Sequence, residues 1–512
     1  MNATLRRLST IVMVMFLALM VSTTWIQFVS AESLNSDGRN VRTIYSSLAR
    51  DRGPIVVGGD PIVTSVPVDD NYKYLRTYSE GDAGAASVYA PVTGYFAING
   101  TVTGMERYAN SYLAGEDDSL WLDRLQNLIT GEEAQGSSVE LTIDPEVQKA
   151  AWDALGDYTG AAVALDPKTG AILAMVSKPS YDPNTLAVHD SKKVTATSEA
   201  LINDKPQVNT TDGSERYSVY GPTINRTINA IYPPGSTFKL LTSAAAIEYD
   251  GKTPDTQIPA PDVYQLPGTS DDNGKVHNFG GETCSGTQQM TLKDALKISC
   301  NTAFTGLAAE VGKDGMQKMF EDFGFTESLD IPMSTSVGAY PGLSDIAKDD
   351  SDARIALSGM GQGDLRVTPL QIAMISAAIA NDGELMEPYL IDNVRDSDLE
   401  LVSQTKPNRY KSPFSSSTAD ALTEMMLSVV NDDGGTGSGA QIPGVQVAGK
   451  TGTAEDDPRS PTLWFTSFAP ADDPQVAVAV VLENEGQSTN ESTGGALAAP
   501  IAAQIMQAAI AK

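Results

Sequence analysis

The chain has 512 residues, of which 41% are hydrophobic, so it can bury a sizeable core and is long enough for more than one domain. This composition excludes a disordered or fibrous protein. The formal net charge of -30 would repel nucleic-acid phosphates and anionic lipid headgroups. We therefore expect no nucleic-acid partner and interpret the charge as a solvated acidic surface.

The first predicted element is an apolar segment, residues 8–29, which carries no charge. Its length suits a bilayer, which needs roughly 20 apolar residues. Arg6 and Arg7 precede it, and this basic flank predicts a cytoplasmic N-terminus with everything after residue 31 outside the cytoplasm. A cleaved signal peptide is the alternative, because Val29-Ser30-Ala31 is typical of a cleavage site, but the apolar stretch exceeds the usual length of about 7 to 15 residues. We predict a single-pass anchor within residues 1–31.

Residues 32–140 form the next predicted unit, in which short strand-like runs alternate with glycine, aspartate and serine turns. It contains no cluster of reactive side chains, so we interpret it as a non-catalytic pedestal or dimerisation-like domain. Residues 141–143 then predict a strand that leads into a helix, with Asp144 as N-cap and Pro145 as the first helical residue. We expect a second domain over residues 141–512.

Five strands and a closing helix are predicted in this second domain, around a mostly helical middle. Residues 161–165 and 171–176 are apolar runs joined by Asp166-Pro167-Lys168-Thr169-Gly170, which predicts an antiparallel hairpin. The other predicted elements are strands at 446–454, 464–469 and 476–482, a helical region at about 236–430 and a helix at 496–511. Because strands bracket helices, the predicted fold class is α+β.

Cysteine and histidine are scarce, which limits the chemistry available. Cys284 and Cys300 could form a disulfide outside the cytoplasm, and the sequence leaves this open. The only histidines are His189 and His277, too few for a zinc cage, so we expect no metal or other cofactor. His189 precedes Asp190, but no Gly-x-Ser-x-Gly motif is present, and we interpret this histidine as a solvated loop residue.

Ser236 is the candidate nucleophile. It follows Pro233-Pro234-Gly235 and precedes a strong helix-forming run, so it is predicted at a helix N-terminus. The three-residue spacing places Ser236 and Lys239 on one helical face, where an amine with a lowered pKa can take the hydroxyl proton. Backbone N–H groups at the helix start can hold a developing oxyanion. A second Ser-x-x-Lys match begins at Ser403, in what we predict to be a polar loop.

Two further short motifs each occur more than once. Ser299-Cys300-Asn301 ends a predicted helix and could face a cleft, whereas Ser488-Thr489-Asn490 lies in a predicted polar loop. Lys450-Thr451-Gly452 lies on a predicted strand, whose edge could bind an extended peptide while the lysine attracts its carboxylate. Lys168-Thr169-Gly170 is instead the tip of the predicted hairpin. Each match alone is weak evidence, and the prediction depends on their order and settings together.

Together these motifs resemble a known family. The segments Ser236-Thr237-Phe238-Lys239, Ser299-Cys300-Asn301 and Lys450-Thr451-Gly452-Thr453 resemble, in order, the three motifs of penicillin-binding proteins and serine β-lactamases. Gly361-Gln362-Gly363, followed by Val367-Thr368-Pro369-Leu370-Gln371, is similar to the class B transpeptidases. The segment Tyr89-Ala90-Pro91-Val92-Thr93-Gly94-Tyr95 is similar to the actinobacterial penicillin-binding protein A group. The resemblance implies a transpeptidase domain with a five-stranded antiparallel sheet flanked by helices.

The resemblance also implies catalytic roles. Ser236 would attack the carbonyl of the penultimate D-Ala of a peptidoglycan stem peptide, and Lys239 would activate it. Ser299 would relay the proton to the leaving D-Ala. An amine of a neighbouring stem peptide would resolve the acyl-enzyme and form a crosslink, whereas β-lactam antibiotics would stop the reaction at the acyl stage.

Five residues would bind the substrate according to the same resemblance. Asn301 would position the peptide, and Lys450 and Thr451 would hold its terminal carboxylate, with Gly452 beside them on the strand. The backbone N–H group of Thr453 would form the oxyanion hole together with that of Ser236. One departure concerns the pedestal, where Arg52-Gly53-Pro54-Ile55 lacks the Asp-Arg continuation of many class B pedestals.

A nucleotide-binding P-loop is the first competing interpretation, because residues 444–451 match Gly-x-x-x-x-Gly-Lys-Thr. A P-loop must turn into a helix. Here β-branched Val445 and Val447 favour a strand, and Gly452 and Pro458 make a poor helix start. We therefore expect no ATP binding.

Other members of the resembled family are also considered. A β-lactamase would need a deacylating base, but no Glu-x-x-Leu-Asn lies between Ser299 and Lys450. A β-lactam sensor would need a larger cytoplasmic region than the few residues before the anchor. About 110 residues before Asp144 are marginal for a second catalytic domain, so we expect a separate membrane glycan polymerase as partner. The sequence leaves open a role in elongation or division, the stem-peptide chemistry, and the balance between transpeptidation and carboxypeptidation.

Overall fold

The computed structural model describes residues 3–30, 45, 48–117, 119, 135–204, 207–208, 216–329, 331–454, 462–483 and 493–511. Its first helix, α1 (Ala3–Thr24), continues into the π-helical turn η1 (Trp25–Val29). Within this element, the span Arg6–Phe28 is long and apolar enough to cross a membrane, and its apolar window is not buried in the protein. This matches the position of the predicted anchor.

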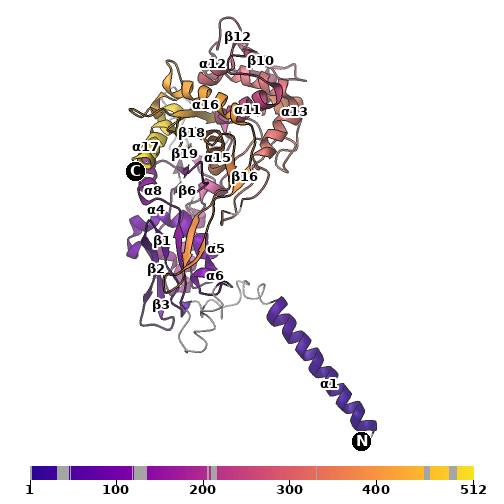
Figure 1. The fold of residues 1–512 in the computed structure, drawn as a ribbon, viewed down its shortest axis with the longest axis vertical. Helices are drawn as coiled ribbons and strands as arrows, with labels where there is room; N and C mark the ends of the chain where they lie inside the picture. The colour runs from indigo at the N-terminus through magenta and orange to yellow at the C-terminus, as the bar shows by residue number, and fades with distance from the viewer. Residues whose placement is uncertain are drawn as a thin grey trace.

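A six-stranded sheet, in the order β15-β14-β4-β1-β2-β3, forms the part of the molecule that follows the anchor in sequence (Figure 1). Its strands are β1 (Ile55–Val57), β2 (Asp60–Pro67), β3 (Tyr74–Tyr78), β4 (Ser138–Leu141), β14 (Ile391–Arg395) and β15 (Leu401–Gln404). Strand β4 pairs in parallel with β1 and antiparallel with β14. The chain therefore returns to its first sheet about 250 residues after leaving it, since Ile391 pairs with Leu141.

A buried ion network lies in this first part of the molecule. Glu106, which is fully buried, accepts hydrogen bonds from Arg52 Nη2 at 2.8 Å and from Arg76 Nε at 2.5 Å. Arg52 belongs to the segment that departs from the usual pedestal pattern, and this contact gives its guanidinium a partner. The surrounding helices are α4 (Ala83–Thr93), α5 (Gly104–Tyr108) and α6 (Asn110–Leu113).

The second sheet has five antiparallel strands in the order β17-β18-β19-β5-β6. They are β5 (Gly160–Leu165), β6 (Ile172–Lys178), β17 (Ala448–Ala454), β18 (Thr462–Ala469) and β19 (Val476–Glu483). All five predicted strands are confirmed, with ends that differ by at most two residues. Every residue of β18 and β19 is buried, because helices cover both faces of the sheet and its strands are apolar throughout.

Helices α8 (Pro145–Leu155) and α17 (Ala499–Ile510) pack on one face of this sheet. The predicted cap of α8 is confirmed, because the Asp144 carboxylate accepts hydrogen bonds from two backbone N–H groups of the first turn. The predicted C-terminal helix is also present, but it is preceded by a π-helical turn, η9 (Gly494–Ala498).

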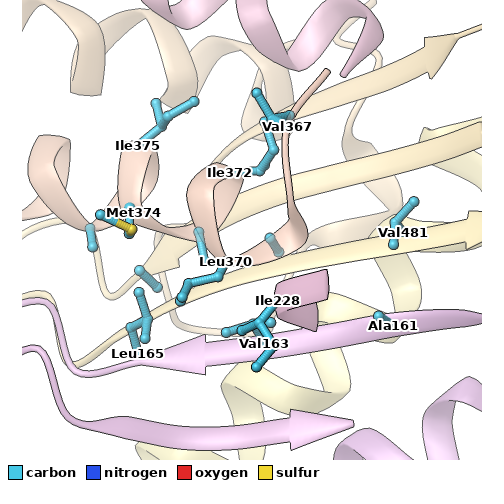
Figure 2. Close-up of a cluster of buried hydrophobic side chains, with 14 of the residues drawn as sticks. Ala161, Val163, Leu165, Ile228, Val367, Leu370, Ile372, Met374, Ile375 and Val481 are labelled. Atoms are coloured by element: carbon cyan, nitrogen blue, oxygen red, sulfur yellow. The ribbon is translucent and has the colours of Figure 1, made fainter. Parts of the chain in front are cut away.

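Helix α15 (Pro369–Ala380) lies on the opposite face, and all of its residues are buried. A capping box between Thr368 and Gln371 starts it. Figure 2 shows Leu370 of this helix close to Val163 of β5 and to Ile228, with Met374 farther along the helix. This packing forms the core directly behind the strands.

A mostly helical region lies above the five-stranded sheet in Figure 1, within the part of the chain predicted to be helical, which also supplies β14 and β15 to the six-stranded sheet. Its helices are α11 (Lys239–Asp250), α12 (Leu292–Lys297), α13 (Asn301–Asp322), α14 (Asp352–Ser358) and α16 (Ser416–Asn431). Short strand pairs accompany them: β10 (Val263–Gln265) with β11 (Lys275–His277), β9 (Gln257–Pro259) with β12 (Gln289–Thr291), and β13 (Leu385–Met386) with β16 (Arg409–Lys411). The other elements are α9 (Ser191–Asn203), α10 (Arg226–Asn229), β7 (Gln207–Val208) and β8 (Arg216–Tyr217).

Candidate active site

Ser236 lies in the 3₁₀ turn η5 (Gly235–Phe238), which leads directly into α11. The predicted helix start is therefore present, but its first turn is tighter than an α-helix. Side chains three residues apart are eclipsed in a 3₁₀ turn, which keeps Ser236 and Lys239 on one side of the element. Ser236 is partly exposed, whereas Lys239 is fully buried.

Two glycines allow the backbone to come close around this turn. Gly235 has a φ of +52° and donates a backbone hydrogen bond to Gly361 O at 3.0 Å. A Cβ at Gly361 would lie 1.7 Å from Gly235 O, so only glycine fits there. On the other side, a Cβ at Gly452 would lie 2.9 Å from the Thr237 side chain. The turn that carries Ser236 therefore lies between the Gly361-Gln362-Gly363 segment and strand β17.

The Lys239 amine is held at the base of the site. Its Nζ donates to Ser299 O at 2.6 Å, to Ser299 Oγ at 3.1 Å and to Asn301 Oδ1 at 2.8 Å. Burial, followed by the charge of nearby Lys450, holds the pKa of Lys239 well below its usual value. A lysine in this environment can be neutral near neutral pH and can accept a proton.

The buried amine of Lys450, on β17, also contacts Ser299. Lys450 Nζ donates to Ser299 Oγ and to Thr451 O, both at 3.0 Å. Burial lowers the pKa of Lys450 to about 7. The Ser299 hydroxyl therefore lies between two amines, each able to exchange a proton with it.

Ser299 itself connects α12 to α13 and has a φ of +62°, which is uncommon for a residue other than glycine. Cys300 follows as the N-cap of α13, and Asn301 is the first residue of that helix. A disulfide joins Cys300 to Cys284, with the two Cα atoms 5.9 Å apart. The sequence left this pairing open, and the structure shows it formed directly beside the site.

A cavity of about 420 Å³ opens above these groups. It is lined by Ser236, Phe279, Ile298, Ser299, Asn301, Met360, Gln362, Thr436, Thr451, Gly452, Thr453, Thr493, Gly494 and Gly495. Six of the eight predicted site residues thus line one cavity. The other two, Lys239 and Lys450, lie beneath it and contact Ser299.

Several lining residues were not predicted, because no motif marks the segments that carry them. Phe279, Ile298 and Met360 contribute apolar side chains. Thr436 shares a hydrogen bond with the Thr451 hydroxyl at 2.8 Å. Only Gln362 had a sequence signal, since it is the central residue of the Gly-Gln-Gly segment.

The duplicate motifs lie elsewhere. Ser403 is on strand β15 of the six-stranded sheet, opposite Val394, so the predicted loop at this position is wrong. Its short polar sequence forms an edge strand because β14 supplies a pairing partner. Lys168 is at the predicted hairpin tip and forms an exposed ion pair with Asp473. Ser488 lies outside the described residues.

Residues 444–451 do not form a P-loop. The predicted strand is confirmed, since Lys450 and Thr451 lie within β17 and pair with β18. The chain continues along this strand to Ala454 rather than turning into a helix. The arrangement of a phosphate-binding loop is therefore not formed here.

His189 is not the solvated residue that was predicted. Its Nδ1 lies 2.6 Å from Asp70 Oδ2, and 10% of its side chain is exposed. Its ring also packs at 4.8 Å from that of Tyr72. The loop between β2 and β3 covers it, a tertiary contact that the local sequence does not reveal.

The chain matches two family models that together cover most of its length. Residues 160–507 match the penicillin binding protein transpeptidase domain, and residues 52–139 match the penicillin binding protein A dimerisation domain. Peptidoglycan D,D-transpeptidase PbpA of Mycolicibacterium smegmatis is 40% identical over 520 residues, covering 100% of this chain and 99% of the relative. The protein of that name from Mycobacterium tuberculosis is 38% identical over 524 residues, with the same coverage of both chains.

Solved structures are similar over almost the same length. The ceftriaxone acyl-enzyme complex of penicillin-binding protein A from M. tuberculosis has a TM-score of 0.81 at 36% identity, covering 91% of this chain and 100% of that chain. The penicillin G acyl-enzyme complex of the same protein has a TM-score of 0.79 at 36% identity, covering 90% and 100%.

Proposed function

This chain belongs to the penicillin-binding protein transpeptidase family, and we propose that it is a peptidoglycan D,D-transpeptidase that crosslinks stem peptides through a serine acyl-enzyme. The proposed acyl-enzyme mechanism depends on one structural observation. Ser236 borders a cavity in which the Ser299 hydroxyl lies within 3.1 Å of two buried amines with lowered pKa values. Such an arrangement supplies both a nucleophile and a route for its proton.

In the first step, Ser236 Oγ attacks the carbonyl carbon of the penultimate D-Ala and gives its proton to neutral Lys239. The C–N bond to the terminal D-Ala then breaks. The departing amine takes a proton through the Ser299 hydroxyl, which contacts both lysines. Lys239 thereby returns to its neutral form, and the donor peptide remains as an ester on Ser236.

The substrate is proposed to lie along β17. This strand is at the edge of the five-stranded sheet, so it can pair with an extended peptide. Lys450 and Thr451 attract the terminal carboxylate, and Asn301 orients the peptide from the opposite wall. Gly452 leaves room next to the nucleophile turn, as its close approach to Thr237 indicates.

The oxyanion of the tetrahedral intermediate is proposed to bind the backbone N–H groups of Ser236 and Thr453. In the second step, an amine from a neighbouring stem peptide attacks the ester carbonyl carbon, and the bond to Ser236 Oγ breaks. The amine loses a proton and Ser236 Oγ takes one up, which leaves the crosslink as an amide and restores the serine hydroxyl. A β-lactam would acylate Ser236 in the same way and remain attached. The acyl-enzyme complexes of the related M. tuberculosis protein support this part of the proposal.

The membrane arrangement follows from the anchor. We propose a single-pass protein with residues 1–31 as tail and anchor, residues 32–140 as pedestal, and residues 141–512 as transpeptidase domain outside the cytoplasm. The basic flank of α1 and its apolar span support this orientation. A transpeptidase of this kind needs glycan strands to crosslink during growth and division, so a separate membrane glycan polymerase is the proposed partner.

Labelling with a fluorescent penicillin tests the proposal. The full chain, Ser236→Ala and Ser403→Ala are compared, the last as a matched control because it removes the serine of the second Ser-x-x-Lys match. We expect wild type and Ser403→Ala to be labelled and Ser236→Ala to lose the label. Retention of the label by Ser236→Ala would exclude Ser236 as the nucleophile.

A further inference from the structure

A buried carboxylate behind the active site has no part in the proposed chemistry. Glu483 ends β19, is 6% exposed and does not line the cavity. Its Oε1 accepts a hydrogen bond from the Tyr232 hydroxyl at 2.8 Å and one from Arg226 Nε at 3.0 Å. Arg226 is fully buried. A buried ion pair is weak evidence for stability, because desolvation of both charges offsets their attraction.

Tyr232 connects this carboxylate to the nucleophile segment, because it lies four residues before Ser236. Its backbone exchanges two hydrogen bonds with Val367, each of 2.9 Å. Burial, followed by the nearby charge of Glu483, raises the pKa of Tyr232 well above its usual value. The hydroxyl therefore stays protonated and acts as the donor to Glu483.

A tryptophan links the same segment to the sheet. The ring of Trp464 packs edge-on against that of Tyr232, with centroids 6.0 Å apart, and its Nε1 donates to Pro233 O at 3.0 Å. Trp464 is on β18, directly opposite Gly452 of β17. The segment before Ser236 is thus fixed to the strand next to β17.

We propose that Glu483 is a positioning residue, which acts through Tyr232 to set the Ser236 hydroxyl against the edge of β17. This inference rests on the proposed function, since it concerns the rate at which Ser236 is acylated. The physical reason is that a displacement of about 1 Å at the reacting atoms can lower a rate about a hundredfold. The interactions that fix the segment before Ser236 include the contact of Tyr232 with Glu483, its pairing with Val367, and the hydrogen bond of Trp464 to Pro233.

The molecule contains a matched control for this network. In the six-stranded sheet, Tyr78 is 1% exposed, and its hydroxyl contacts the buried carboxylate of Glu106 at 3.4 Å. Glu106 in turn binds Arg52 and Arg76, so the same residue types form the same kind of buried network. None of the four residues of this second network lines the cavity. We therefore expect Tyr78→Phe to remove a comparable hydroxyl and to leave acylation of Ser236 unchanged.

The experiment measures acylation of the full chain by a fluorescent penicillin at several concentrations. This separates the dissociation constant of the non-covalent complex from the first-order acylation rate constant. We expect Tyr232→Phe to lower the acylation rate constant about tenfold and to leave the dissociation constant within about twofold of wild type. Tyr78→Phe should leave both constants unchanged, and thermal unfolding of each variant reports any loss of stability.

Two outcomes would overturn the proposal: an unchanged acylation rate constant in Tyr232→Phe, or an equal loss in Tyr78→Phe. Glu483→Gln provides a second test, because its amide oxygen can still accept the Tyr232 hydroxyl. We expect it to acylate faster than Glu483→Ala, and the reverse order would also contradict the proposal. Failure of wild type to be acylated at all would instead contradict the proposed function.

Discussion

At the scale of single residues, two buried lysines of the candidate active site contact the same serine, Ser299. Lys239 and Lys450 both contact Ser299 Oγ, and the charge of Lys450 contributes to the lowered pKa of Lys239. When two like charges lie this close, their titrations are coupled, and protonation of one amine disfavours protonation of the other. We therefore propose that Lys450 helps to keep Lys239 neutral, in addition to its proposed role in carboxylate binding.

Lys450→Met should move the pH dependence of acylation. Removing the Lys450 charge raises the pKa of Lys239, so a higher pH is needed to make Lys239 neutral. The acidic limb of the acylation rate constant should then shift to higher pH, although burial still keeps the pKa of Lys239 below its usual value. The measurement is the rate of penicillin acylation as a function of pH.

Lys168→Met is the control for this prediction, because it removes the lysine of the second Lys-Thr-Gly match from an exposed ion pair. Its pH profile should coincide with that of wild type. A Lys450→Met profile that stays in place, or that moves to lower pH, would show that Lys450 does not lower the pKa of Lys239.

The sequence predicted the motif residues but not the residues that support them. Ser236, Ser299 and Lys450 were identifiable because short motifs occur in the order and settings of the resembled family. The contact between Tyr232 and Glu483 joins positions 251 residues apart, and no local pattern indicates it. The prediction for His189 was wrong for the same reason, since Asp70, which covers it, is 119 residues away in sequence.

At the scale of elements, the loop after β11 is attached to the start of α13 at three places. Asn301 Nδ2 donates to His277 O at 3.3 Å, and Thr302 N donates to Asn278 Oδ1 at 3.0 Å. The disulfide between Cys284 and Cys300 is the third attachment. Between these points, Phe279 is 47% exposed and lines the cavity. The loop thereby forms a wall of the active site.

Replacing both cysteines with serine should loosen this wall. Because the disulfide closes a loop of 16 residues, we expect its loss to cost about 3 kcal/mol of stability. The dissociation constant for non-covalent penicillin binding should rise by a larger factor than the acylation rate constant falls. The reason is that Phe279 lines the cavity, whereas Ser236 belongs to another element. Thermal unfolding and the two acylation constants check this result.

Thiol labelling of the wild-type protein is the direct test of the bond itself. Unfolded wild type should take up no alkylating reagent before reduction and two equivalents after it. Two reactive thiols without prior reduction would contradict the disulfide.

Strand positions could be predicted because apolar runs bounded by turn residues are visible in the sequence, as for β5 and β6. Two turns could not be predicted from the sequence: the tight 3₁₀ turn at residues 235–238 and the π-helical turn at residues 494–498. Each depends on packing against backbone that is distant in the sequence. Strand β15 was missed because its burial is low and its pairing partner β14 determines its conformation.

At the scale of the whole molecule, the N-terminal part of the chain and the part that contains the candidate active site contribute strands to the same sheet. The six-stranded sheet takes β14 and β15 from the segment that also contains the active site. Side chains reinforce the contact: Gln148 Nε2 donates to Val88 O at 3.0 Å, and Asn225 Nδ2 donates to Pro91 O at 3.0 Å. Asn225 directly precedes Arg226, so this contact lies next to the network that includes Glu483.

A fragment of residues 141–512 should therefore be less stable than one of residues 48–512. Without β1 and most of β4, strand β14 still pairs with β15 but loses its pairing with β4, so it exposes an unpaired edge. We expect a lower midpoint of thermal unfolding and association of the fragment. Differential scanning calorimetry and size-exclusion chromatography measure these properties, and equal midpoints with a monomeric fragment would show that the two parts fold independently.

The shared sheet also has a consequence for biosynthesis. A ribosome delivers β1 to β4 first, but the strand that covers the open side of β4 arrives only when residue 391 has been made. During the intervening 250 residues, the nascent chain presents backbone N–H and C=O groups that can pair with another copy. We therefore expect the time needed to make and deliver this interval to determine how long the edge of β4 stays unpaired.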